Sequence, residues 1–148
     1  MAHVRTQIRD AFVARLAGLA TTGSAVFGQR NRPIAAVPTF LKVFIGDDDG
    51  ELLCATDDLI EQRNAGLVIE AYAKSSGDME DILDQIALEV QQQIATTSDR
   101  SFGGLVKQIG APRIELDVDD SLEKPCGVNR IIYPITYCIA GSNPAVAL

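Results

Sequence analysis

The chain has few of the residues on which common catalytic and recognition sites depend. Among its 148 residues there is no tryptophan, aromatic residues make up 5%, and the one histidine is His3. So few aromatics argue against a platform for stacking nucleic-acid bases, and a single histidine leaves too few ligands for a Cys/His zinc site. The three cysteines, Cys54, Cys126 and Cys138, form no CxxC pair, which disfavours a disulfide framework and indicates a reducing compartment.

Positive charge is also in short supply. Lysine and arginine number 13 against 20 aspartates and glutamates, for a formal net charge of −7. An acidic domain lacks the basic surface that drives binding to a phosphate backbone, so we expect no direct recognition of DNA or RNA. No hydrophobic run is long enough to span a membrane, and the N-terminal residues carry charges throughout, unlike a signal peptide. We therefore expect a protein made in the cytoplasm with no membrane partner.

What the chain does have is the composition of a single globular domain, with 47% hydrophobic residues. The strongest local signal lies at 67–94, where an alternating apolar pattern predicts a strand that leads into an amphipathic helix. The apolar stripe of that helix consists of Met79, Ile82, Leu83, Ile86, Val90 and Ile94. A second helix is predicted at 2–17 from apolar residues at spacings of three and four.

Further strands are predicted at 24–27, 38–46, 113–119 and 128–139. In 113–119 the alternation predicts that Ile114, Leu116 and Val118 face inward. Two stretches, 46–66 and 98–112, read as long loops, and 140–148 reads as a mobile tail; a short helix or an extended β-ribbon is the alternative for 46–66. Together these elements predict an α+β fold: a mostly antiparallel sheet of four to five strands, with two helices packed on one face. The natural neighbours are 38–46 with 67–74 and 113–119 with 128–139.

The acidic run at 47–51 and a pair of carboxylates are the candidates for chemistry. The run lacks the spacing of an EF-hand loop, because its acids are consecutive and Thr56 stands where the pattern needs a glutamate. Glu115 and Asp117 share one side of a strand, which is most often an exposed sheet face. We assign no catalytic, cofactor-binding or metal-binding residue. A small enzyme or a metal-binding domain that uses the acidic run stays open as an alternative.

Several segments taken in order carry a family resemblance. They are the N-terminal segment with His3, Arg5 and Leu16, then VFGQRNRPI, PTFLKVFIGDDD, LVIEAYAK and RIIYPITYCI. The matching positions in the first half are Val26, Phe27, Arg30, Pro33, Pro38, Val43 and Asp47–Asp49. In this order they resemble the tail terminators, a family of minor tail proteins of long non-contractile-tailed phages. The resemblance covers most of the chain.

The resemblance implies a structural protein of the virion, with no enzymatic activity and no cofactor, at the head-proximal end of the tail. Such proteins form a ring, here expected to be a hexamer, on the last ring of the major tail tube protein. The ring stops tube polymerisation and presents a surface to a head-completion or connector protein, while DNA passes through without specific binding. A neighbouring neck component of the same fold is the alternative.

A ring of acidic subunits requires basic residues opposite acidic ones at its interfaces, because like charges repel. The candidate subunit or partner contacts are therefore Arg30, Arg32, Asp47, Asp48, Asp49, Glu80 and Asp84.

Overall fold

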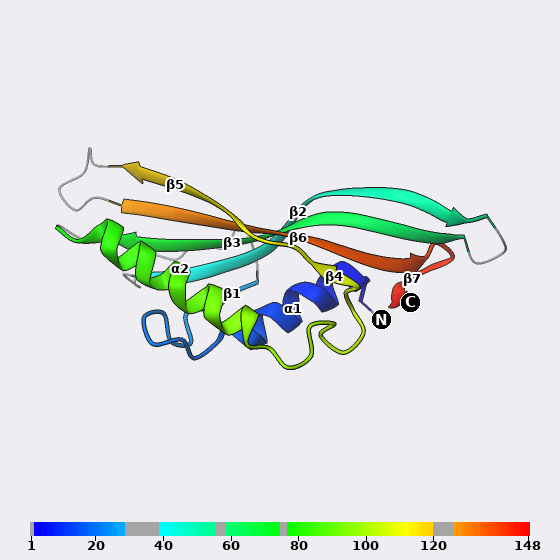
Figure 1. Cartoon of the computed structure of the whole chain (residues 1–148), viewed down its shortest axis with the longest axis horizontal. Coiled ribbons are helices and arrows are strands. Elements are labelled where there is room, and N and C mark those ends of the chain that lie inside the picture. The colour runs from blue at the N-terminus through cyan, green and yellow to red at the C-terminus, as the bar shows by residue number, and fades with distance from the viewer. Residues whose placement is uncertain (1, 29–38, 56–58, 75–76, 120–125) are drawn as a thin grey trace.

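The computed structural model describes residues 2–28, 39–55, 59–74, 77–119 and 126–148. Two helices lie along one face of a curled, mixed and mostly antiparallel sheet, so the predicted α+β class is confirmed (Figure 1). The elements are α1 Val4–Leu16, β1 Val26–Phe27, β2 Thr39–Cys54, β3 Ile60–Lys74, α2 Met79–Ala95, β4 Gln108–Ile109, β5 Arg113–Asp119, β6 Cys126–Ala140 and β7 Asn143–Ala147.

The sheet is built on one long antiparallel ladder between β3 and β6. This ladder runs from the pair Lys74↔Cys126 to the pair Ile60↔Ala140. β2 pairs with the other edge of β3 and carries the short parallel strand β1. β5, β4 and β7 follow one another along the remaining edge of β6. Both predicted strand pairs, 38–46 with 67–74 and 113–119 with 128–139, are therefore formed over their described residues.

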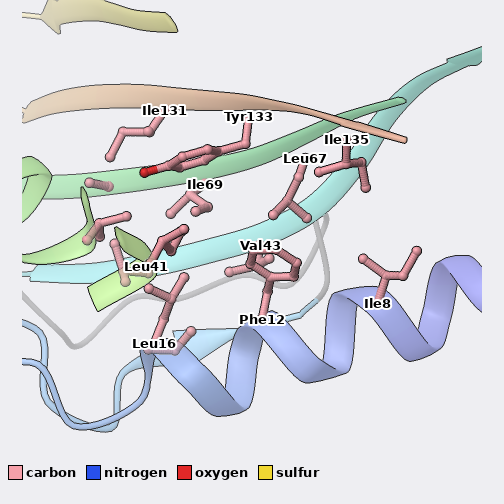
Figure 2. Close-up of a cluster of buried hydrophobic side chains, with 14 of the residues drawn as sticks. Ile8, Phe12, Leu16, Leu41, Val43, Leu67, Ile69, Ile131, Tyr133 and Ile135 are labelled. Carbon is pink, nitrogen blue, oxygen red and sulfur yellow. The ribbon is translucent and has the colours of Figure 1, made fainter. Parts of the chain in front are cut away.

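The hydrophobic core lies between this sheet and the two helices (Figure 2). α1 contributes Val4, Ile8, Phe12 and Leu16, each fully buried, at a spacing of four that keeps them on one face. α2 contributes the predicted stripe, of which Met79, Leu83, Ile86, Val90 and Ile94 are buried. The ring of Phe12 also stacks on Phe102 with centroids 4.2 Å apart, which holds the segment after α2 against α1.

The prediction of a long loop at 46–66 is wrong, and the β-ribbon alternative is right. β2 continues to Cys54 and β3 begins at Ile60, with pairing from Asp48↔Ala65 outward. The acidic residues conceal the strand because most of them stand on exposed faces of a sheet that projects beyond the helices (Figure 1). We call this projection the β-arm; it comprises residues 47–54, 60–65 and 135–140 together with β7.

Three other predictions need comment at the edge of β6. β5 forms as predicted, but Ile114 and Leu116 are 45% and 50% exposed rather than buried. The reason is that α2 packs chiefly against β3 and β6, so it does not cover the outermost strand. The predicted tail 140–148 holds the strand β7, and the carbonyl of Ala145 accepts a hydrogen bond from Gln7 Nε2 at 2.8 Å. The stretch 98–112 is irregular apart from β4.

Candidate functional site

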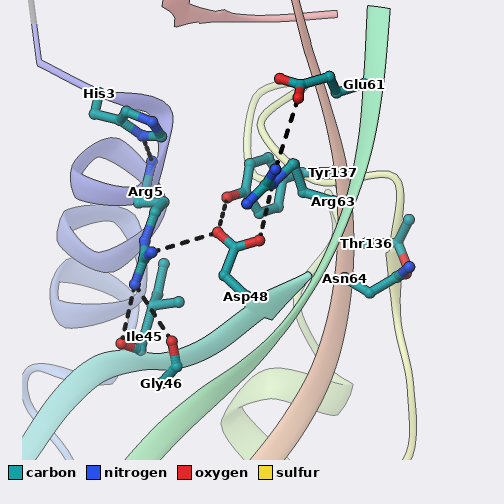
Figure 3. A network of polar contacts seen from close by, with 10 residues as sticks. All are labelled: His3, Arg5, Ile45, Gly46, Asp48, Glu61, Arg63, Asn64, Thr136 and Tyr137. Atoms are coloured by element: carbon teal, nitrogen blue, oxygen red, sulfur yellow. Dashed lines mark hydrogen bonds and ion pairs between the residues drawn. The ribbon is translucent and has the colours of Figure 1, made fainter. Parts of the chain in front are cut away.

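A polar network lies at the base of the β-arm, where β2 passes through a bulge. The pairing of β2 with β3 steps from Ile45↔Leu67 to Asp48↔Ala65, so two residues of β2 stand opposite one residue of β3. A bulge of this kind bends its strand and re-aims the side chains that follow. The side chain of Asp48 consequently points toward α1 and is only 4% exposed (Figure 3).

Three side chains from three different elements converge on the Asp48 carboxylate. Arg63 on β3 donates from Nε to Oδ1 at 3.0 Å. Tyr137 on β6 donates its hydroxyl to Oδ2 at 2.5 Å, and Nη1 of Arg5 on α1 lies 3.5 Å from the same oxygen. Glu61 lies 3.8 Å from Arg63 and extends the network along β3. We call this set the Asp48 clamp, because it ties α1 to three strands of the sheet.

Arg5 has a second role in the clamp. Its Nη2 donates to the carbonyl oxygens of Ile45 and Gly46, each at 3.3 Å, where the bulge interrupts the ladder. The backbone of Arg5 is itself fixed at the start of α1, where its N–H donates to Nδ1 of the N-cap residue His3 at 3.1 Å. The guanidinium therefore fastens the helix start to the bend in β2.

Electrostatics make the clamp a fixed set of charges. Burial raises the pKa of Tyr137 above its ordinary value, and the hydrogen bond to Asp48 raises it further. Burial lowers the pKa of Arg63, but the hydrogen bond and the charge of Asp48 outweigh it, so the net shift is upward. At neutral pH the phenol keeps its proton and the guanidinium keeps its charge. The arrangement is suited to holding elements in place, not to transferring protons.

Gly50 makes room for the clamp. In the β2–β3 ladder it stands opposite Arg63, and a Cβ atom at Gly50 would lie 2.2 Å from Nη1 and 2.9 Å from Cζ of that arginine. The guanidinium of Arg63 therefore packs directly against the backbone of Gly50 and reaches Asp48 through space that a side chain would fill. Gly50 belongs to the predicted long loop 46–66, but in the structure it has a packing role in a strand.

The far end of the β-arm exposes apolar side chains. Leu52 and Leu53 are each 54% exposed, and Leu59 is 45% exposed. Since side chains alternate along a strand, the exposed acidic residues Asp49 and Glu51 share one face of β2, and Leu53 follows them at the irregularity between Leu52 and Cys54. We call residues 51–53 together with Leu59 the arm tip. It presents leucines beside negative charge.

A cavity of about 290 Å³ lies at the C-terminal end of α2, and we call it the α2 pocket. Its wall combines apolar and polar side chains, and Tyr133 on β6 contributes to it. Burial raises the pKa of Tyr133 to about 12, so this phenol is neutral at physiological pH. The residues that line the pocket are Gln91, Ile94, Ala95, Arg100, Ile109, Gly110, Ala111, Pro112 and Tyr133.

The sheet face that points away from the helices holds a second buried carboxylate. Glu70 is 5% exposed, accepts a hydrogen bond from the Tyr72 hydroxyl at 2.6 Å, and lies 3.9 Å from Nε of Arg130. The ring of Tyr72 stacks on Phe40 at 4.6 Å between centroids. Sequence reasoning missed this group; its available signal is that Glu70 stands opposite two basic residues, Lys42 on β2 and Arg130 on β6, once the strands are in register.

The acidic residues predicted as contacts fall into two groups. Asp47 and Asp49 are exposed on the β-arm, and Glu80 and Asp84 are exposed on α2. Asp48 differs from them because its carboxylate is buried in the clamp, where it cannot meet a partner's surface. The structure does not bring the β-arm acids and the α2 acids into one site.

The basic residues predicted as contacts, Arg30 and Arg32, lie outside the described residues. Among the residues that are described, no three potential ligand side chains are grouped so as to hold a metal ion. The alternative of a metal-binding domain that uses the acidic run also loses one possible ligand. The carboxylate of Asp48 already forms ion pairs with Arg5 and Arg63. Within the same residues no helix is long and apolar enough to cross a membrane.

Comparisons with known proteins add no assignment. No protein-family model matches the chain, and no curated protein matches its sequence.

Proposed function

We propose that this chain is a structural subunit that assembles with copies of itself into a ring, a hexamer, at the head-proximal end of a phage tail. The ring ends polymerisation of the tail tube and offers a surface to the head-completion protein. The order of sequence segments that resembles the tail terminators motivates the proposal. The β-arm is the structural observation that supports it most strongly.

The β-arm is supported along its length by further strands and at its base by the Asp48 clamp. An isolated two-stranded ribbon is marginally stable in water, but here β2 and β3 are widened by β6 and β7, and the Asp48 clamp fixes their base to α1. Such an arm presents exposed leucines at an end of the sheet that neither helix covers (Figure 1). Exposed apolar patches rimmed by polar residues are typical of protein–protein contact sites, and the β-arm therefore favours an assembling subunit.

The exposed apolar surfaces also differ from one another. The arm tip lies at one end of an elongated molecule, and the outer strand β5, with Ile114 and Leu116 exposed, lies toward the other end (Figure 1). A ring is closed by heterologous contacts, in which one patch meets a different patch on the next copy, so an arm tip that docks on a surface other than a second arm tip suits a ring. A net charge of −7 per subunit further suits a passage through which DNA moves without binding.

Assembly with tail tubes tests the proposal. The purified chain, added to the polymerising tube protein of the same phage, should form rings on tube ends and shorten the tubes in negative-stain images. Leu53→Asn should lose this effect, whereas Leu88→Asn, at a residue of α2 that is 48% exposed, should keep it. Tubes whose ends stay bare and whose lengths do not depend on the chain would overturn the proposal. Binding to a head connector but not to tubes would replace it with the neck-component alternative.

A further inference from the structure

The arm tip has acidic and apolar side chains that no ion pair or burial among the described residues accounts for. Leu53 is half exposed, and the exposed acidic residues that precede it in β2, Asp49 and Glu51, form no ion pair with any described residue. A binding partner for this tip must therefore offer an apolar recess beside positive charge.

The α2 pocket offers both on the same chain. Ile94, Ile109 and Pro112 give it apolar walls, and Arg100 stands among its lining residues. The guanidinium of Arg100 makes one long hydrogen bond, from Nη2 to the Ala95 carbonyl at 3.4 Å, and no ion pair with any described residue. The volume of about 290 Å³ lies at the lower end of the range for small-ligand pockets, so it suits side chains better than a large cofactor.

The acidic residue next to Arg100, Asp99, makes its hydrogen bonds within its own turn and forms no ion pair with that guanidinium. The Asp99 carboxylate accepts hydrogen bonds from the Ser101 hydroxyl and from the backbone N–H groups of Ser101 and Gly103. The hydroxyl of Tyr133 is a further open group, since it has no hydrogen-bond partner among the described residues. Positive charge and a free hydroxyl are thus available where an acidic strand tip could dock.

The α2 pocket and the exposed apolar surface of β5 differ in the charges that surround them. Ile114 and Leu116 on β5 are accompanied by Glu115 and Asp117, and Arg113 is already paired with Glu115 at 2.9 Å. The one basic residue of β5 is therefore already engaged, and this strand offers the acidic arm tip no unpaired positive charge. The arm tip would be attracted at Arg100. The β-arm extends away from α2, whose C-terminal end lines the pocket, so the contact must join two copies (Figure 1).

We propose that the arm tip of one copy docks into the α2 pocket of the next, with Leu53 filling the apolar recess and Glu51 facing Arg100. The contact is head-to-tail, because each copy offers its arm to one neighbour and its pocket to the other. Contacts of this type close into a ring when the rotation between neighbours allows it. The inference rests on the proposed ring assembly and names the surfaces that would hold the ring together.

Charge reversal tests this contact. Glu51→Arg and Arg100→Glu should each weaken self-association about tenfold or more, and each should leave the thermal unfolding midpoint unchanged because both residues are exposed. An equal mixture of the two variants should recover association, since every arm can then meet a pocket of opposite charge in an alternating ring. The double variant should recover it alone. Sedimentation velocity and negative-stain imaging, with and without tube ends, provide the readout.

Leu53→Ser should abolish ring formation, and Leu116→Ser, which removes a side chain of similar exposure from β5, should preserve it. Single charge variants that assemble like the wild type, or a mixture that does not recover, would overturn the contact while leaving the proposed function in place. Rings that form normally with Leu53→Ser but no longer cap tubes would assign the arm tip to the tube protein instead. A wild-type chain that forms no rings, alone or on tubes, would overturn both.

Discussion

Replacing Asp48 by asparagine removes the charge on which the clamp is built while preserving the shape of the side chain. The carboxylate is 4% exposed, and it joins Arg63 at 3.0 Å, Tyr137 at 2.5 Å and Arg5 at 3.5 Å. Breaking a buried ion pair costs about 3–5 kcal/mol. Here Arg63 and Arg5 are 26% and 40% exposed and can turn partly to water. We therefore expect a loss of about 2–3 kcal/mol, the upper range for hydrogen bonds to charged groups.

For a domain of this size, that loss lowers the thermal unfolding midpoint by about 4–12 °C. Circular dichroism melts and calorimetry measure it. Asp47→Asn is the matched control. It removes the same charge from the neighbouring residue, which is exposed, and should leave the midpoint unchanged. Amide hydrogen exchange should also accelerate in residues 47–54 and 60–65, which the clamp holds. Equal midpoints for the two variants would refute the clamp as the support of the β-arm.

Three further predictions concern the core and its pH dependence. Gly127→Ala should lower the free energy of unfolding in urea by about 1–3 kcal/mol, because its Cβ would lie 2.7 Å from Cδ1 of Leu83. An unchanged midpoint would show that α2 can shift to accommodate the methyl group without cost. Phe12→Ala should cost about 3–5 kcal/mol through loss of a fully buried ring, and a smaller loss would show that the site collapses around the cavity. Tyr133 and Tyr137 have raised pKa values in the folded protein, so stability should be complete below about pH 10 and fall as the pH rises toward 12; urea midpoints that stay constant over this range would contradict their burial.

Local pattern in the sequence was sufficient to predict the core. The stripe of α2 and the alternation in 67–74 depend on one face being buried, and that requirement acts on each element separately. The pairing of neighbouring strands followed from the same information. Ile114 and Leu116 show the limit, since alternation predicted the strand β5 but not that it would be the outermost strand, beyond the cover of α2.

The candidate site could not be predicted in the same way, because it depends on distant parts of the chain. Asp48 turns inward only after a bulge, and its hydrogen-bond partners Arg63 and Tyr137 are 15 and 89 positions away. In the sequence it is one of three consecutive aspartates with nothing to distinguish it from its neighbours. The α2 pocket likewise combines side chains from three parts of the chain: the end of α2, the segment between α2 and β5, and β6.

The central claim is that a ring of this chain terminates the tail tube. The most direct test is to measure tail length in a phage that lacks the chain. Electron microscopy of lysates should show tails that grow past their normal length and carry no heads, and supplying the wild-type chain should restore uniform tails joined to heads. Tails of normal length joined to heads in the absence of the chain would contradict the account.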